Sequence, residues 1–255
     1  MSSVNTMHPD EVTARIQLAA CYRIFHHLGW TELIYNHITV RLPESVSGAE
    51  KQFLINPFGL HYSEVAAGNL VKIDVRGRVL DGSVHRVNPA GFTVHAALHQ
   101  GLAGAHCVMH THTTAGSAVA GSQCGLTLDN FYAAQLHGRV AYHDFEGITI
   151  VADEGPRLLA DIGDKHCVIL RNHGLLTWGQ TVPLALAYLW TLQRACEVQL
   201  ASAALGAVRP ISEPVLAQCA KASLQFDPNY GAGQDIFDAL VRQVDATQGS
   251  GWRAL

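Results

Sequence analysis

The sequence predicts an α/β protein with a mixed, largely antiparallel central sheet flanked by helices. The 255 residues are 48% hydrophobic and only 15% charged, a composition that suits one large folded core. Segments with the apolar spacing of helices are interspersed with short alternating or apolar segments typical of strands. The order lacks the strict strand–helix alternation of a dinucleotide fold, and neither a Gly-x-Gly-x-x-Gly motif nor a Gly-Lys-Ser/Thr loop occurs.

The first half of the chain predicts one helix followed by several strands. Apolar spacing indicates a helix over residues 9–27 that opens at Pro9 and stops at Gly29. Alternating segments predict strands at 37–42, 52–55, 70–75 and 78–80, the last two forming a hairpin around Gly77. A second helix is expected over 91–102, a buried strand over 107–110 and a third helix over 113–120.

The second half predicts an irregular region over 121–146, a helix at 156–162, a strand at 167–170 and extended structure at 175–177. The longest helix is expected over 182–205, closed by Gly206 and followed by Pro210. We therefore expect one main domain over residues 9–206. Residues 207–255 are expected to form a helical appendage or tail of the same unit.

Charge and cysteine content exclude several classes of partner. The formal net charge of −4 gives no electrostatic reason to expect nucleic acid or an anionic membrane. The six cysteines are scattered without a Cys-x-x-Cys pair, as in a reduced cytoplasmic protein. No signal peptide and no stretch of 18 apolar residues is apparent. We expect a cytoplasmic protein that acts on a small molecule.

Histidine is unusually abundant, with 15 residues against 17 lysines and arginines together. His110 and His112 follow an apolar segment and are one residue apart, so in an extended backbone their side chains share a face. His173 also lies just beyond an apolar strand, before Gly174. Three imidazoles would leave coordination positions open, as in a catalytic metal site. The spacing alone is equally compatible with ordinary polar residues at strand ends.

Five landmarks in order resemble the class II aldolase/adducin-head family, over about residues 11–204. They are Tyr35-Asn36-His37-Ile38-Thr39-Val40-Arg41, Asn56-Pro57-Phe58-Gly59, Val87-Asn88-Pro89-Ala90-Gly91, His110-Thr111-His112-Thr113 and Arg171-Asn172-His173-Gly174-Leu175-Leu176. The resemblance implies a three-layer αβα fold and ligation of one divalent metal by His110, His112 and His173. Zinc is the first expectation for this metal, with manganese or iron as alternatives. It also implies a homotetramer with sites at subunit interfaces.

The chain departs from the sugar-phosphate aldolases of the family at the substrate end of the site. Those enzymes carry two phosphate-binding serines and an acid/base glutamate where Pro89, Ala90 and Gly91 stand here. Phe58 replaces the threonine that usually precedes the glycine at position 59. None of these residues supplies a hydroxyl or carboxylate. We therefore expect Phe58, Gly59 and Gly91 to border a less polar, non-phosphorylated substrate.

Three further residues are candidates for the site. Asn36 is expected either to donate a hydrogen bond to the substrate or to stabilise a turn. Tyr132 matches loosely the family's tyrosine from the neighbouring subunit, and is either a proton donor or a buried interface aromatic. His95 lies one turn beyond Gly91 on the expected helix and could replace the missing glutamate, or could be a core histidine.

The function expected from these features is a metal-dependent carbon–carbon lyase that catalyses aldol cleavage or decarboxylation of a small carbonyl or carboxylic acid compound. Decarboxylation is attractive because it needs no base to remove a hydroxyl proton. A non-haem Fe(II) oxygenase acting on an aromatic acid is the first alternative. A non-catalytic, adducin-like interaction module is the second, although the three retained histidines favour an enzyme.

Overall fold

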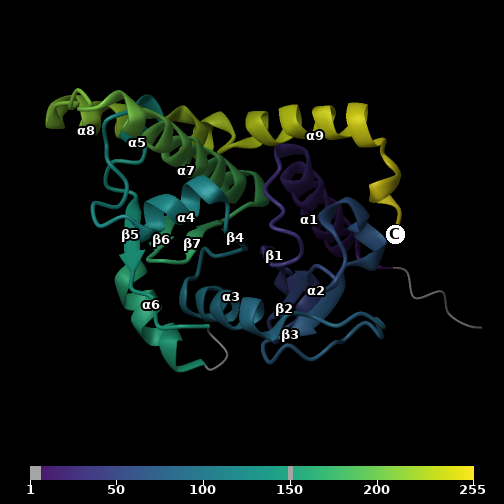
Figure 1. The fold of residues 1–255 in the computed structure, drawn as a ribbon. Helices are drawn as coiled ribbons and strands as arrows, with labels where there is room; N and C mark the ends of the chain where they lie inside the picture. The colour runs from purple at the N-terminus through teal and green to yellow at the C-terminus, as the bar shows by residue number, and fades with distance from the viewer. Residues whose placement is uncertain (1–6, 149–151) are drawn as a thin grey trace, which may run out of the picture.

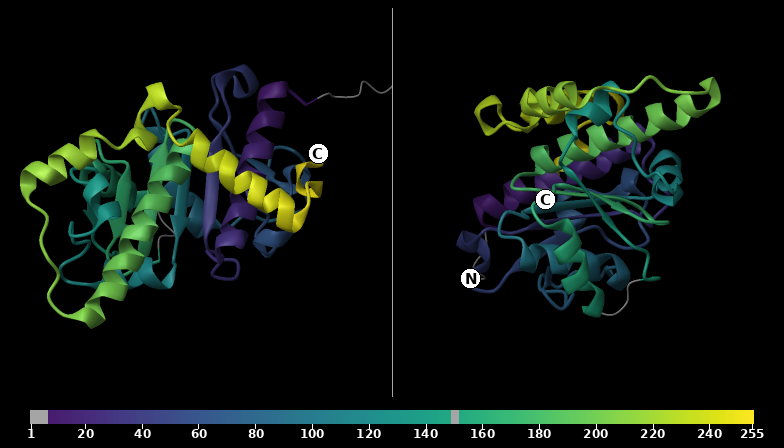
Figure 2. Two further views of the ribbon diagram at one scale, coloured as in Figure 1. Left: turned by 90° about the horizontal axis from the view of Figure 1, so that it is seen from above. Right: turned by 90° about the vertical axis from the view of Figure 1, so that its left-hand side faces the viewer.

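The structure is a computed structural model and describes residues 7–148 and 152–255. It has three layers, with a central sheet between two sets of helices (Figures 1 and 2). One face of the sheet carries α1 (Pro9–Leu28), α4 (Thr114–Gly121) and α7 (Val182–Ser202), and the other carries α3 (Pro89–Gly101) and α6 (Gly155–Ile162). The predicted α/β class is therefore confirmed.

The described residues form a seven-stranded sheet in the order β3-β2-β1-β4-β7-β6-β5. β5 runs parallel to β6, and each of the other neighbouring pairs is antiparallel. The strands are β1 (His37–Arg41), β2 (Gln52–Ile55), β3 (Val71–Asp74), β4 (Cys107–Thr111), β5 (Val140–His143), β6 (Cys167–Leu170) and β7 (Gly174–Gly179). β4, β5 and β6 end at the edge of the sheet where β1 and β7 begin, so their adjoining loops gather at that edge.

The two faces of the sheet bury different chemistry, as β1 illustrates. Its side chains alternate between the faces. Ile38 and Val40 join the apolar core under α1 and α7. His37 and Thr39 face α3 instead, where both hydrogen-bond to His95. One face is therefore an apolar core, while the other combines smaller apolar clusters with a polar layer beside the edge of the sheet.

Two sequence predictions differ from the structure. The region predicted to be irregular over 121–146 contains the short helix α5 (Phe131–Gln135) and the edge strand β5. The predicted hairpin around Gly77 is reduced to β3 and a single bridge between Ile73 and Val79. Asp74 accepts hydrogen bonds from the backbone N–H groups of Arg76 and Arg78, which ends the ladder in a tight turn.

The C-terminal segment packs against the main body through α9 (Gln234–Gln248), which follows α8 (Glu213–Lys221) and crosses α1 and α7 (Figure 1). Phe237, Leu240 and Val244 of α9 and the nearby Trp252 are buried in the core that also contains α1. The short helix α2 (Glu44–Ser47) lies between β1 and β2 in the sequence. Among the described residues, no helix is both long and apolar enough to span a membrane.

Candidate metal centre

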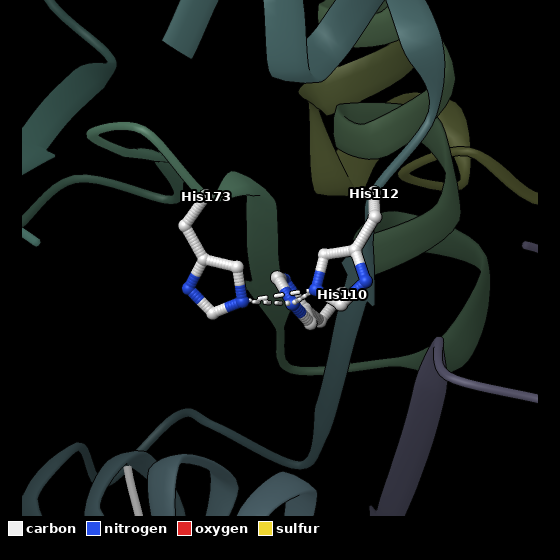
Figure 3. A group of neighbouring side chains, drawn as sticks. All are labelled: His110, His112 and His173. Carbon is white, nitrogen blue, oxygen red and sulfur yellow. Dashed lines mark hydrogen bonds between the residues drawn. The ribbon is translucent and has the colours of Figure 1, made fainter. Parts of the chain in front are cut away.

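Three histidine side chains from distant parts of the sequence converge at one point (Figure 3). The Nε2 atom of His110 lies 2.6 Å from Nε2 of His112 and 3.2 Å from Nε2 of His173. The Nε2 atoms of His112 and His173 are 2.9 Å apart. Among the histidine, cysteine, aspartate and glutamate residues that the structure describes, these three form the group whose potential ligand atoms lie close enough together to share one metal ion.

Strand pairing brings the three histidines together. His110 lies within β4 and His112 follows that strand, while His173 occupies the turn between β6 and β7. β4 pairs with β7 up to Thr111, opposite Leu175. At the start of β7, a Cβ atom on Gly174 would lie 2.3 Å from the carbonyl oxygen of Thr111. Only glycine allows the turn to approach β4 this closely, and this approach places His173 opposite the other two histidines.

Hydrogen bonds around the histidines orient their rings and segments. The Nδ1–H of His110 donates to the carbonyl oxygen of Leu175 over 2.8 Å, which leaves a lone pair on Nε2. The Ser117 hydroxyl of α4 lies 3.1 Å from the carbonyl oxygen of His112 and 3.2 Å from that of His173. Ser117 therefore ties together the two segments that carry these histidines.

The environment keeps all three imidazoles neutral near pH 7. Burial holds the pKa of His110 well below its ordinary value of 6.5, and the nearby His112 and His173 lower it further. Burial, assisted by the neighbouring His173, lowers the pKa of His112 to about 4. Burial also lowers the pKa of His173. Neutral imidazoles carry the lone pairs that metal ions bind.

The donor set fits a divalent transition-metal ion. Three neutral Nε2 atoms that face one another at these distances cannot all be satisfied by hydrogen bonds among themselves. A single cation that accepts all three lone pairs would satisfy them, and imidazole nitrogen is a preferred ligand of zinc and of the neighbouring transition metals. The site also opens on one side to a pocket, as a catalytic site requires.

The pocket beside the three histidines has a volume of about 990 Å³. It lies at the edge of the sheet where β4 and β6 end, between the loop after α1, the start of α3 and the loop after β5. Among the described residues that line the pocket, Glu32 is the one aspartate, glutamate, lysine or arginine. Apolar and aromatic side chains form much of the wall: Leu33, Tyr35, Phe58, Val94, Phe145 and Ile148.

The residues expected to bind substrate are only partly at this pocket. Phe58 and Gly91 line it, whereas Gly59 is exposed outside it. Asn36 is buried, and its side-chain amide is engaged by the backbone. Its Nδ2 donates to the carbonyl oxygen of Trp30 over 2.7 Å, and its Oδ1 accepts from the backbone N–H of His112 over 2.8 Å. The turn role considered for Asn36 therefore fits better than the substrate role, and the turn it stabilises positions His112.

The two candidate acid/base residues lie outside the pocket lining of the single chain. His95 is fully buried behind His37 and bonds to it through Nε2 over 3.0 Å. The expectation that His95 faces the metal is therefore wrong, because the His37 ring stands between His95 and the pocket. Tyr132 is partly buried and packs against the apolar core, with its ring centroid 5.7 Å from that of Trp190.

Sequence reasoning missed His37 and Ser117. His37 lines the pocket, and its ring centroid lies 5.0 Å from that of His110. Burial lowers the pKa of His37 to about 3, and the nearby His112 and His173 add to this shift. His37 directly follows Asn36 in the first of the five family landmarks, and this position was the sequence signal that could have identified it as a pocket residue. The sequence around Ser117 carries no comparable signal.

The class of protein that this fold and site define is confirmed by comparison. The family model described as class II aldolase and adducin N-terminal domain matches residues 16–200. The chain therefore belongs to the class II aldolase/adducin family, whose aldolases generally use a divalent metal such as zinc.

Its similarity to individual proteins extends over almost the whole chain. An aldolase II superfamily protein from Pseudomonas syringae is 36% identical, with a TM-score of 0.90 and full coverage of both chains. An L-fuculose 1-phosphate aldolase from Glaciozyma antarctica is 29% identical, with a TM-score of 0.84, and the match covers 100% of this chain and 97% of that one. Alpha-adducin of Rattus norvegicus is 40% identical over 249 residues, which cover 92% of this chain but 33% of alpha-adducin.

Proposed function

We propose that this chain is a divalent-metal-dependent lyase that cleaves a carbon–carbon bond beside the carbonyl or carboxylate group of a small, non-phosphorylated substrate. The observation that carries this proposal is the convergence of the Nε2 atoms of His110, His112 and His173 within 3.2 Å at a large pocket. Membership of a family that includes metal-dependent aldolases supports it. A bound divalent cation would supply a Lewis acid that polarises a substrate oxygen.

The pocket lining argues for an unphosphorylated substrate. Phosphate is usually bound by arginine, lysine, hydroxyl groups or backbone N–H groups. The described lining contains neither lysine nor arginine, its side-chain hydroxyl groups are those of Thr31 and Tyr35, and Phe58 stands where the sugar-phosphate aldolases usually carry a threonine. Val94, Phe145 and Leu33 instead favour an apolar or aromatic substituent. The substrate class that fits is a small hydroxy or oxo acid with an apolar part.

Aldol cleavage and decarboxylation both fit the pocket, and the proton requirement separates them. Aldol cleavage needs a base for a hydroxyl proton, whereas decarboxylation does not. Gly91 offers no carboxylate, and Glu32 is the one carboxylate in the described lining. We therefore rank decarboxylation first and expect zinc, with manganese or iron as alternatives.

Metal analysis tests the first half of the proposal. Protein purified without added metal should contain about one equivalent of a divalent metal per subunit, measured by mass spectrometry of the digested protein. His112→Gln should lose this metal, because the variant lacks one of three ligands. His85→Gln, at a histidine outside the pocket lining, should retain it. Absence of metal that cannot be restored would contradict the proposal and favour a non-catalytic role like that considered for adducin heads.

A substrate screen tests the second half. Metal-loaded protein is incubated with hydroxy and oxo acids, and carbon dioxide and aldehyde products are measured alongside oxygen consumption. Metal-dependent release of either product without oxygen uptake is expected. Oxygen uptake by an iron-loaded protein would contradict the lyase proposal and favour the oxygenase.

We also propose a homotetramer in which Tyr132 acts on the site of a neighbouring subunit. The single chain exposes large apolar side chains near α5 and the pocket, including Phe131 at 72% and Leu33 at 71% exposure. Mixing two inactive variants, Tyr132→Phe and His112→Gln, should restore part of the activity once subunits exchange, because some sites then combine both intact residues. Analytical ultracentrifugation measures the assembly. A monomer, or a mixture without restored activity, would contradict this arrangement.

A further inference from the structure

His37 occupies the space left by the absent side chain at position 91. A Cβ atom on Gly91 would lie 2.4 Å from Cδ2 and 2.6 Å from Nε2 of His37. Both distances are far shorter than a normal contact, so the His37 ring in this position requires glycine at 91. Gly91 and His37 both line the pocket. The residue that replaces the missing carboxylate in space is therefore His37 of β1, not a residue of α3.

His37 is the first member of a buried chain of hydrogen bonds. Its Nδ1 lies 3.0 Å from Nε2 of His95. The hydroxyl oxygen of Thr39 lies 2.7 Å from Nδ1 of His95 and 2.7 Å from Nε2 of His99. Nδ1 of His99 lies 2.7 Å from the carbonyl oxygen of Ala105. All three histidines and Thr39 are buried.

The carbonyl oxygen of Ala105, at the far end of this series of hydrogen bonds, determines which ring nitrogen of each histidine carries a hydrogen. A carbonyl oxygen only accepts, so Nδ1 of His99 carries a hydrogen and its Nε2 does not. Thr39 must then donate its single hydroxyl hydrogen to His99 and accept from Nδ1–H of His95. The Nε2 atom of His95 is left as an acceptor, and it receives the Nδ1–H of His37. One assignment of hydrogens satisfies all four bonds, and it leaves Nε2 of His37 unprotonated.

This assignment requires neutral imidazoles, and burial supplies that condition. Burial lowers the pKa of His99 to about 3 and holds the pKa of His95 well below 6.5. No carboxylate bonds to any of the three rings within the described residues, and the polar partners are hydroxyl, carbonyl and imidazole groups. Buried imidazoles without a carboxylate partner remain uncharged.

We infer that His37 determines substrate specificity by presenting an unprotonated Nε2 to the pocket, where it accepts a hydrogen bond from a hydroxyl or N–H group of the substrate. His95, Thr39 and His99 are positioning residues that fix the His37 tautomer. This inference rests on the proposed function, because it takes the pocket as the substrate site. It narrows the substrate class to compounds that carry a hydrogen-bond donor as well as the carbonyl group that C–C cleavage requires, such as oxo acids with a hydroxyl group, since a second acceptor opposite Nε2 would be left unpaired.

The tautomers are measured by long-range proton–nitrogen NMR of metal-free protein labelled with nitrogen-15 at histidine, which separates protonated from unprotonated ring nitrogens. His37, His95 and His99 should each carry hydrogen on Nδ1 only. Thr39→Val removes the hydroxyl link and should convert His37 and His95 to mixed tautomers, whereas Thr39→Ser should retain the wild-type pattern. A hydrogen on Nε2 of His37 in the wild-type protein would overturn the inference. If Thr39→Val does not fold, the wild-type spectrum still decides.

The ligand preference is measured with lactate and propionate, two acids that differ in one hydroxyl group, as inhibitors or by calorimetry with metal-loaded protein. His37→Leu should reduce the preference for lactate by roughly 3- to 10-fold relative to wild type, the effect of one neutral hydrogen bond. Comparing variants cancels any contribution of the metal to that preference. An unchanged preference in His37→Leu with normal metal content would overturn the role of His37. If neither acid binds the wild-type protein, both the proposed acid substrate and the hydrogen-bond donor assigned to it are overturned. The NMR spectra would still report whether Nε2 of His37 carries a hydrogen.

Discussion

Asn36 uses both ends of one buried side chain to hold the segment that carries His112 in place. It joins the carbonyl oxygen of Trp30 to the backbone N–H of His112. We expect Asn36→Leu to lower the free energy of unfolding by about 1–3 kcal/mol, because the N–H of His112 loses its acceptor. Metal affinity should fall roughly 10- to 100-fold, as for other supporting residues of metal ligands.

Denaturant unfolding of metal-free protein and metal titration measure these two effects. Asn229→Leu, at an exposed position in the C-terminal segment, is the control and should change stability by less than about 0.5 kcal/mol. If the Asn36→Leu variant binds metal as tightly as the wild-type protein, β4 alone is sufficient to position His112.

The buried histidines make stability depend on pH. The folded protein holds the pKa of His37 and His99 at about 3, and those of His95 and His110 well below 6.5. In the unfolded chain these residues bind protons once the pH falls below about 6.5. The unfolded state then binds more protons than the folded state, so acid destabilises the fold.

We expect the free energy of unfolding of metal-free protein to fall as the pH drops from about 6.5 toward 3, by up to about 1.4 kcal/mol per pH unit for each buried histidine. Denaturant unfolding at several pH values measures the slope. His85→Gln, which removes a histidine outside this buried group, should leave the slope unchanged. A flat profile between about pH 6.5 and 5 would show that the buried rings take up protons in the folded state.

At the level of residues, the convergence of His110, His112 and His173 could be predicted from the sequence, whereas their surroundings could not. His110 and His112 form a local pattern, and the ordered landmarks added His173. The contact between His37 and Gly91 joins residues 54 positions apart, through a strand and a helix whose packing no local pattern specifies. His95 was considered either as a replacement for the glutamate or as a core histidine, and its complete burial behind His37 fits the second alternative, which depended on that same packing.

Among the elements, α1 is fastened to the edge of the sheet by buried charges. Arg15 of α1 bonds to Glu11 over 3.0 Å, to Asp81 over 3.0 Å and to the carbonyl oxygen of Leu70 over 2.7 Å. Arg15 and Glu11 are almost fully buried. We expect Arg15→Met to cost at most about 3–5 kcal/mol of stability, because Glu11 and Asp81 both lose Arg15 and Glu11 keeps the partly exposed Lys72, 2.8 Å away, as its partner.

Denaturant unfolding measures this loss. Arg242→Met, at an exposed position on α9, makes the same change in a helix and should cost less than about 0.5 kcal/mol. Equal effects of the two substitutions would mean that the buried charges contribute little beyond their surface counterparts.

Element length alone does not decide which elements the sequence predicts. The predicted helix over 9–27 corresponds to α1, and the predicted strand over 52–55 corresponds to β2, which spans only four residues. α5 is a single helical turn, too short to show a helical period. β5 is as long as β2, but it is held by parallel pairing with β6, which comes later in the sequence, so tertiary contacts rather than local pattern determine it.

In the whole molecule, the C-terminal segment completes the helical layer above α1 and α7. Leu240 of α9 is 8% exposed, whereas Leu224 in the same segment is 47% exposed. We expect Leu240→Ala to lower stability by about 2–5 kcal/mol through lost burial and a cavity. Leu224→Ala should cost less than about 1 kcal/mol because its side chain is half in water.

Thermal or denaturant unfolding with one probe in α9 and another in the main body measures both variants. Two separate transitions would contradict the packing described here, in which α9 shares a core with α1. The patterns of helices and strands predicted a mixed sheet flanked by helices, and the family resemblance implied the three-layer arrangement. The docking of α9 could not, since an amphipathic helix alone does not specify its partner.

The alternation of side chains along β1 limits how a protein of this kind can change over evolutionary time. Ile38 and Val40 belong to the apolar core, while His37 and Thr39 belong to the histidine chain. Inserting or deleting one residue within β1 would exchange these two sets, leaving imidazoles among aliphatic side chains. Point substitutions in the pocket loops avoid that exchange. New substrate preferences are therefore expected to arise by altering the pocket loops and the first turn of α3, with the length of β1 preserved.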